Sequence, residues 1–65
     1  NIVADVIIAL APRVRQALRP DAWLACSGVI DSRLDEVTRA LEELRFEILE
    51  VRESGEWRAI ICRRT

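Results

Sequence analysis

The chain has 65 residues, 51% of them hydrophobic, and a formal net charge of −1. This balance excludes the strongly basic field that accompanies binding to nucleic acid or to an anionic membrane. All ten basic residues are arginine and none is histidine, so the commonest general base and metal ligand is missing. No run approaches the ~20 apolar residues that cross a membrane, and the first residues do not resemble a signal peptide.

A chain of this length has room for one small core, and it buries only about 60% of its unfolded surface. Its long apolar runs contain more apolar surface than two small helices and three strands can easily bury. A compact mini-domain is one interpretation. We favour the other, in which residues 1–65 form a single partial domain whose sheet requires more strands and which is inactive alone.

A first helix is predicted from about Val3 to Leu18, because apolar residues recur there at steps of three and four. Pro12 interrupts this pattern, since it cannot donate a backbone hydrogen bond and its ring crowds the preceding turn. The sequence therefore predicts either a kink at Pro12 or a second helix that begins there. Pro20 ends the element. The predicted apolar stripe consists of Val3, Ile7, Leu10, Val14 and Leu18.

A first strand is predicted over Ala22–Ser27, where alternate positions on both faces are apolar. This pattern is typical of a strand that is covered on both sides, as in parallel sheets. Gly28 is expected to end the strand, and Trp23 to lie in the core. The isolated Cys26 and Cys62 are predicted to be buried free thiols, because their spacing fits neither a disulfide framework nor a metal site.

A second helix follows, with Ser32 as its N-cap and Asp35 as the reciprocal residue of a capping box. Its apolar stripe consists of Leu34, Val37, Leu41 and Leu44.

Two further strands are predicted, Phe46–Arg52 and Trp57–Arg63, with Gly55 supplying the positive φ of a tight hairpin. Broken alternation around Leu49 indicates a bulge or cover on both faces. We place the hairpin at the end of the sheet opposite Ser27. Core packing is favoured over a substrate contact for Trp57.

The predicted fold is therefore α/β, in the order helix, strand, helix, strand, strand. A crossover between parallel strands is right-handed. The last strand is apolar on both faces and fits best in the centre of the sheet, antiparallel to its two neighbours. The strand Ala22–Ser27 then keeps one free apolar edge.

This topology and several ordered motifs resemble the ribosomal protein L11 methyltransferases, the PrmA family. The likeness runs along essentially all 65 residues and implies the C-terminal half of a Rossmann-like methyltransferase sheet, with the antiparallel last strand in a central position. At Asp21-Ala22 the chain departs from the family, where a Gly-Gly pair is usual, and we expect only the turn to change. The motifs are Asn1-Ile2-Val3-Ala4, Leu10-Ala11-Pro12, Leu18-Arg19-Pro20, Ser27-Gly28-Val29-Ile30 and Gly55-Glu56-Trp57.

The resemblance implies a cytoplasmic bacterial enzyme that transfers methyl groups from S-adenosylmethionine to amino groups of a ribosomal protein. It places Asn1 at the end of the fourth strand as the catalytic residue, where its amide accepts hydrogen bonds from the incoming amine. Such a transfer depends on positioning more than on a strong base. Asn1 is also a favoured N-cap for the helix that follows.

The same resemblance suggests that Ile2 packs near the cofactor. Ser27 and Gly28 follow a strand's carboxyl end, where open α/β sheets bind their ligands, and are candidates for substrate binding. Gly28 can equally serve only the turn. The main cofactor motifs of the family are a Gly-rich turn and an acidic residue, and we expect both upstream of Asn1.

A second hypothesis is a stand-alone α/β interaction module that dimerises through its open sheet edge. The sequence upstream of Asn1 distinguishes the two. A strand with a Gly-rich turn there supports the enzyme, whereas a start codon directly before Asn1 contradicts it.

Overall fold

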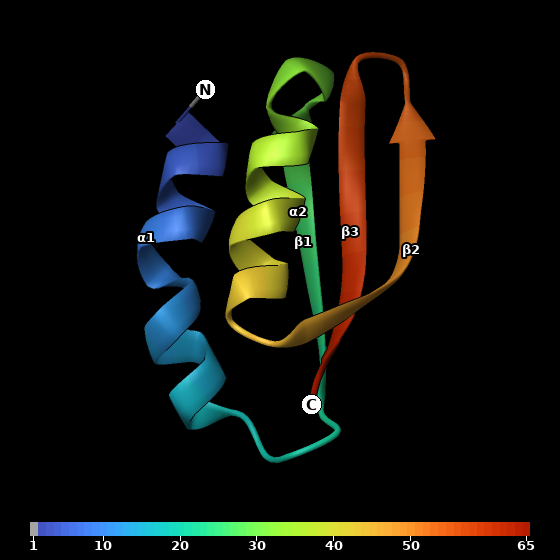
Figure 1. The fold of residues 1–65 in the computed structure, drawn as a ribbon. Helices are drawn as coiled ribbons and strands as arrows, with labels where there is room; N and C mark the ends of the chain where they lie inside the picture. The colour runs from blue at the N-terminus through green and yellow to red at the C-terminus, as the bar shows by residue number, and fades with distance from the viewer. Residues whose placement is uncertain (1) are drawn as a thin grey trace.

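The computed structural model describes residues 2–65 as a three-stranded sheet with two helices (Figure 1). The strand order is β1-β3-β2, and β3 is antiparallel to both neighbours, so β1 and β2 run in the same direction. This confirms the predicted order of elements and the central position of the last strand. The elements are α1 (Ile2–Ala17), β1 (Trp23–Ile30), a 3-10 turn (Asp31–Arg33), α2 (Leu34–Glu43), β2 (Phe46–Ser54) and β3 (Trp57–Arg64).

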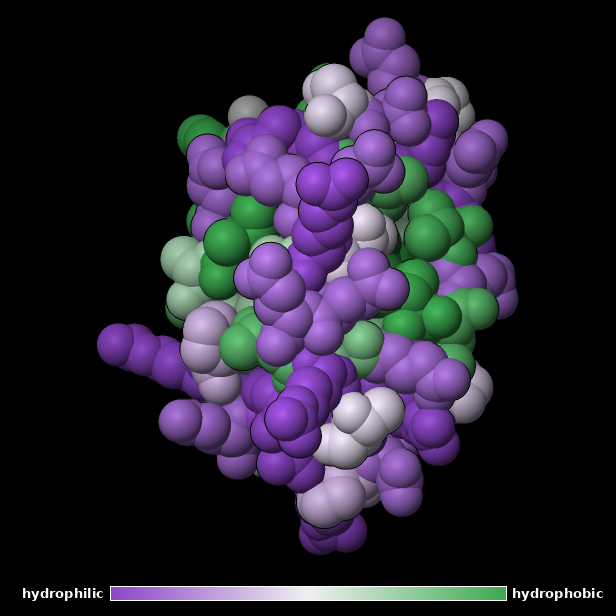
Figure 2. Space-filling view, viewed as in Figure 1, coloured by the Kyte–Doolittle hydropathy of each residue, from purple (hydrophilic) through white to green (hydrophobic). Residues whose placement is uncertain are grey.

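The helices pack on one side of the sheet. In Figure 1, α2 lies in front of the sheet and α1 lies beside it, next to β1. The core between these layers contains the fully buried side chains of Leu41, Ile60, Val29, Val37 and Cys62. Figure 2 shows the same side, with hydrophilic side chains across the middle of the molecule and hydrophobic ones on both flanks. The described residues form only this small sheet, so the larger Rossmann-like sheet stays a prediction.

The sequence predicted that both faces of β1 are buried, but the helices of the described chain pack on only one face of the sheet. Leu24 and Cys26 point toward the helices, whereas Trp23 and Ala25 point away and are exposed. The prediction that Trp23 lies in the core is wrong for the described residues, because its side chain is 69% exposed. The strand also lies at an edge of this sheet, since its only hydrogen-bonded neighbour is β3.

The first helix is continuous through Pro12, so the alternative of two helices is wrong. The buried residues of α1 are Ala4 and Ala11, and the predicted stripe lies to one side of them: Val3 and Leu10 are 38% and 47% exposed. Alanine lets a helix backbone approach its neighbours closely. The larger side chains of the stripe therefore border the contact instead of filling it.

The predicted capping box at the start of the second helix is wrong. Ser32 lies inside the 3-10 turn, and Arg33 occupies the N-cap position of α2 with no side-chain capping hydrogen bond. A 3-10 turn at a helix start winds the chain more tightly than an α-helix does. The predicted apolar face of the helix is confirmed by the burial of Val37 and Leu41.

β1 and β2 each contain one extra residue relative to β3, and only the irregularity in β2 was predicted. The register of β1 against β3 shifts between Cys26 and Val29, so the strand continues past Gly28 to Ile30 instead of ending there. The bulge in β2 lies between Ile48 and Glu50, as one of the two interpretations of Leu49 predicted. The hairpin is tighter than expected, since Ser54 pairs with Trp57 around a two-residue turn.

Candidate functional site

The candidate site lies at the edge of the molecule where β1 and β2 end, which we call the carboxyl edge. Four segments meet there: the first turn of α1 (residues 2–5), the bulge at Ser27 and Gly28, the 3-10 turn and the β2–β3 hairpin. Figure 1 shows the start of α1, the 3-10 turn and the hairpin at the same end of the molecule, where β1 also ends. Open α/β sheets bind ligands at this edge because loops and helix starts converge there.

The bulge of β1 places Gly28 directly beside the first turn of α1. Gly28 has a φ of +77°, a left-handed conformation that other residues adopt only with strain. A Cβ atom at this position would lie 3.7 Å from Cγ1 of Val3, which is ordinary van der Waals contact. The conformation, more than lack of space, therefore selects glycine. The neighbouring Ser27 is exposed.

The hairpin lies at the same edge as Ser27, and its predicted placement at the opposite end is wrong. The backbone N–H of Asp31 donates a hydrogen bond of 2.8 Å to the carbonyl of Glu56. An ion pair of 3.0 Å joins Arg58 Nη2 to Asp31 Oδ1. Because β2 runs parallel to β1, its carboxyl end and the turn that follows must lie at the carboxyl end of β1.

Trp57 is 49% exposed, so core packing does not account for this side chain in the described chain. It lines a shallow hollow of about 160 Å³ together with Ser27 and Gly28. The polar side chains of Arg52 and Glu53 border the same hollow. Here an aromatic surface lies beside charged groups and a hydroxyl group, a combination suited to holding part of a polypeptide.

A larger groove of about 330 Å³ runs between α1 and the outer edge of β1. Apart from Ser27 at one end, its lining is apolar and includes Ile2, Val6, Leu10 and Leu24. Such a lining mainly offers a surface for packing, and its one thiol, that of Cys26, is buried. We therefore place the candidate site at the carboxyl edge and not along this groove.

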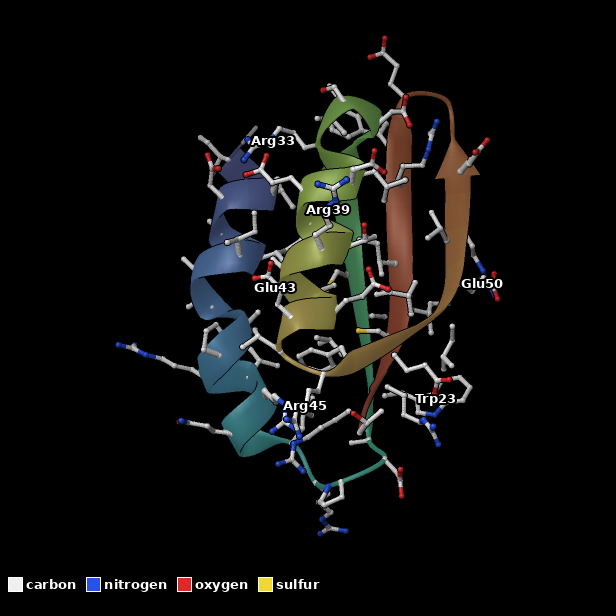
Figure 3. The ribbon with its side chains drawn as sticks, in the orientation of Figure 1. Trp23, Arg33, Arg39, Glu43, Arg45 and Glu50 are labelled. Atoms are coloured by element: carbon white, nitrogen blue, oxygen red, sulfur yellow. The ribbon has the colours of Figure 1, made fainter. Side chains whose placement is uncertain are left out.

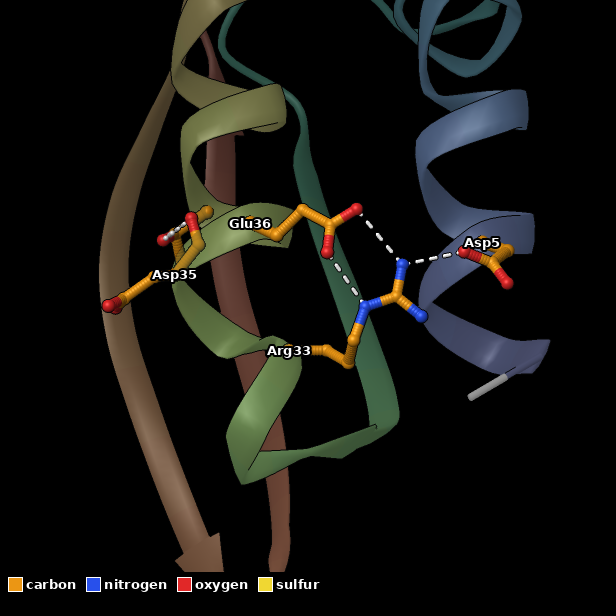
Figure 4. Close-up of polar contacts among 5 residues, drawn as sticks. Asp5, Arg33, Asp35 and Glu36 are labelled. Atoms are coloured by element: carbon orange, nitrogen blue, oxygen red, sulfur yellow. Dashed lines mark hydrogen bonds and ion pairs between the residues drawn. The ribbon is translucent and has the colours of Figure 1, made fainter.

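An ion-pair cluster connects two segments of the carboxyl edge. Arg33 donates hydrogen bonds to both carboxylate oxygens of Glu36, at 2.7 and 2.9 Å, and a third of 2.6 Å to Oδ1 of Asp5 (Figure 4). The hydrogen bond from Arg33 is the main cause that lowers the pKa of both carboxyl groups. The cluster thus links the start of α2 to the first turn of α1.

Both cysteines are free and buried, as predicted. Desolvation raises the pKa of Cys26 and, with the nearby Cys26 as a second cause, raises that of Cys62 to about 11. Both thiols are therefore neutral near pH 7 and unsuited to act as nucleophiles. Among residues 2–65, no group of three or more acidic, Cys or His side chains is placed to hold a metal ion. No helix in that range is long and apolar enough to span a membrane.

Of the residues proposed from the sequence, Ile2, Ser27 and Gly28 come together at the carboxyl edge. Ile2 is 80% exposed in the first turn of α1 and lines the same groove as Ser27. Asn1 lies outside the described residues. Sequence reasoning missed Trp57 as a site residue, although the parallel direction of the first two strands already implied that the hairpin lies at their carboxyl ends.

The amino-acid sequence of the chain matches those of known proteins. Residues 1–65 match the family described as ribosomal protein L11 methyltransferase (PrmA). Proteins of that name from Heliobacterium modesticaldum and Thermoanaerobacter pseudethanolicus are 48% and 47% identical to the chain over 64 residues. A third, from Desulforamulus reducens, is 44% identical over 62 residues. These alignments cover 95–98% of the chain, and the chain spans about 20% of the length of each relative.

Proposed function

The chain belongs to the ribosomal protein L11 methyltransferase (PrmA) family, and we propose that it is a segment of an S-adenosylmethionine-dependent enzyme that methylates amino groups of ribosomal protein L11. The match along all 65 residues is the observation that carries this proposal. A segment of such an enzyme acts in the cytoplasm with a ribosomal protein as its partner. Membership of a family whose members are about five times longer favours this function over a stand-alone dimerising module.

The roles that we propose for Asn1 and Ile2 at the carboxyl edge follow from the chemistry of methyl transfer to an amine. S-adenosylmethionine supplies an electrophilic methyl group when bound. Asn1 orients the neutral amine by accepting its N–H hydrogen bonds, so that the nitrogen lone pair faces the methyl carbon. Ile2 presents an exposed apolar side chain in the next position, which fits a van der Waals contact with the cofactor. Positioning of this kind supplies a large part of a rate enhancement.

Substrate binding is proposed for Ser27 and Gly28, and the geometry adds Trp57 to them. The three residues line one hollow at the carboxyl edge, next to the turn of α1 in which Ile2 lies. Trp57 offers a flat apolar surface for the aliphatic part of an amine-bearing side chain, and Ser27 offers a hydroxyl group for its polar end. The described residues do not include the Gly-rich turn expected to hold most of the cofactor.

We further propose that the segment is the C-terminal part of a Rossmann-like catalytic domain. The order β1-β3-β2 with a central antiparallel β3, and the apolar groove along the free edge of β1, support this position. Sequencing the gene on both sides of the segment tests it. A strand followed by a Gly-rich turn is expected before Asn1, and finding these elements after Thr65 instead would overturn the proposed position.

Kinetics of the full-length enzyme test the catalytic assignment. Asn1→Ala is expected to lower kcat for methylation of the ribosomal protein by one to three orders of magnitude, because a misaligned amine loses most of the benefit of positioning. Asn1→Asp keeps the size and the acceptor oxygen but adds charge, and serves as the matched variant. Unchanged turnover in Asn1→Ala, with folding intact by circular dichroism, removes Asn1 from the mechanism.

A further inference from the structure

The ion pairs of Arg33 bridge two elements that are far apart in the sequence. Arg33 lies at the N-cap position of α2, and Asp5 lies one turn into α1, 28 residues earlier. Figure 4 shows the guanidinium between the two helices, with Glu36 on one side and Asp5 on the other. Figure 3 places Arg33 at the end of the molecule where the chain begins, away from Trp23.

The geometry of the cluster restricts where the first turn of α1 can lie. The two parallel hydrogen bonds to Glu36, through Nε and Nη2, fix the plane of the guanidinium. The same Nη2 then donates a hydrogen bond to Asp5, which links the first turn of α1 to the start of α2. The Arg33 side chain is only 24% exposed, whereas Asp5 and Glu36 are 66% and 56% exposed.

On its other side, the same turn of α1 contacts the bulge of β1. The side chain of Val3 faces Gly28, which adopts a left-handed conformation. Because glycine has no Cβ, no side chain separates the two segments. The first turn of α1 is thus held between the substrate-side bulge and Arg33. Ile2 and Asn1 belong to or adjoin this turn, so a displacement of the turn moves the groups proposed to act on the amine and the cofactor.

We infer that Arg33 is a positioning residue, which sets the first turn of α1 for methyl transfer through its bridge to Asp5. The inference rests on the proposed function, because the turn matters for turnover only if Asn1 and Ile2 act there. A purely stabilising role is the alternative. Exposed ion pairs contribute only about 0–1 kcal/mol to folding, so removing this bridge should leave the protein folded.

The test uses four variants of the full-length enzyme. Arg33→Gln and Asp5→Asn each remove the bridge, and the double variant tests whether the two residues act as one unit. Arg63→Gln is the matched control, because Arg63 also makes a 2.6 Å ion pair, with Glu47, and pairs with Asp21 at the opposite end of the sheet. For each variant, kcat and KM for the ribosomal protein and the thermal midpoint are measured.

Arg33→Gln and Asp5→Asn are expected to lower kcat about five- to tenfold with KM changed less than twofold. The double variant should be no slower than the slower single variant, and Arg63→Gln should retain at least half of the wild-type kcat. If kcat of Arg33→Gln stays within twofold of the wild type, or falls equally in Arg63→Gln, the inference is overturned.

Amide hydrogen exchange provides a readout that does not depend on activity. In an α-helix that begins at Ile2, the N–H groups of Val6 and Ile7 bond to the carbonyls of Ile2 and Val3. Their exchange should accelerate at least fivefold in Arg33→Gln and stay unchanged in Arg63→Gln. Unchanged exchange overturns the inference by itself. A wild-type enzyme without methyl transfer would instead refute the proposed function, and exchange would still decide whether Arg33 holds the turn.

Discussion

The backbone N–H of Asp31 lies 2.8 Å from the carbonyl oxygen of Glu56 and ties the end of β1 to the β2–β3 hairpin. This hydrogen bond and the pairing of Trp57 with Ile30 hold Trp57 at the carboxyl end of β1, where it lines one hollow with Ser27. The substrate side of the proposed site therefore includes a tryptophan that faces solvent in the described chain.

Replacing Trp57 by alanine should weaken binding of the ribosomal protein. Loss of the aromatic surface is expected to raise KM at least fivefold in the full-length enzyme, because aromatic anchors contribute disproportionately to protein recognition. Trp23→Ala is the matched control, since Trp23 is the other exposed tryptophan and lies away from Arg33 and the carboxyl edge (Figure 3). Equal increases in KM in both variants would contradict a substrate role for Trp57.

Replacing Gly28 by alanine should destabilise the fold because of the backbone conformation at this position. Gly28→Ala is expected to cost about 1–2 kcal/mol of folding free energy, since its φ of +77° is unfavourable for any residue with a Cβ. Gly55 has a similar φ of +59° with nothing near its missing Cβ, so Gly55→Ala should cost a similar amount. Urea unfolding measures both costs.

Only one of these two glycines lies against α1, and activity should separate them. Gly28→Ala is expected to lower kcat because relief of its strain shifts the bulge against Val3. Gly55→Ala should leave kcat within twofold of the wild type. A fall in kcat in neither variant would remove Gly28 from the proposed substrate side while leaving its structural role in place.

Much of the fold could be predicted from local patterns, and the errors have physical causes. The period change after Arg45 and the apolar character of β3 were sufficient to predict the strand order. The capping box at Ser32 and Asp35 failed because a 3-10 turn moved the helix start to Leu34. Trp23 was misplaced because an apolar run does not reveal which face the helices cover.

The candidate site was predictable only where backbone direction determined it. Ser27 and Gly28 follow from the rule that ligands bind at the carboxyl ends of parallel strands. The bridge from Arg33 to Asp5 joins residues 28 apart, and no spacing in the sequence indicates that α1 and α2 begin side by side. The position of Trp57 follows only when the direction of β2 is traced through the turn that joins it to β3.

In the turn before β1, replacing Asp21 by glycine should preserve stability, whereas replacing it by a β-branched residue should lower stability. Asp21 has a φ of +68°, the left-handed region, and its N–H donates a hydrogen bond of 2.8 Å to the carbonyl of Arg64. Asp21→Gly relieves the strain and should match or exceed the wild-type stability. Asp21→Val should lose about 1–2 kcal/mol, measured by urea unfolding. Equal stability of the two variants would show that the conformation of this turn carries no energetic cost.

The thiol of Cys62 should make stability depend on pH in the alkaline range. Desolvation raises its pKa in the folded state to about 11, above its unfolded value of 9.0, so the folded protein retains a proton that the unfolded chain loses. The unfolding free energy should therefore be fully maintained below about pH 9 and fall by ~2–3 kcal/mol as the pH rises to about 11. The segment contains neither lysine nor tyrosine, and its only other thiol is that of Cys26. Urea unfolding of the full-length protein at pH 8 and pH 11 measures the fall, and Cys62→Ala should reduce it by most of this amount. The same pH dependence in both proteins would mean that Cys62 ionises without disturbing the core.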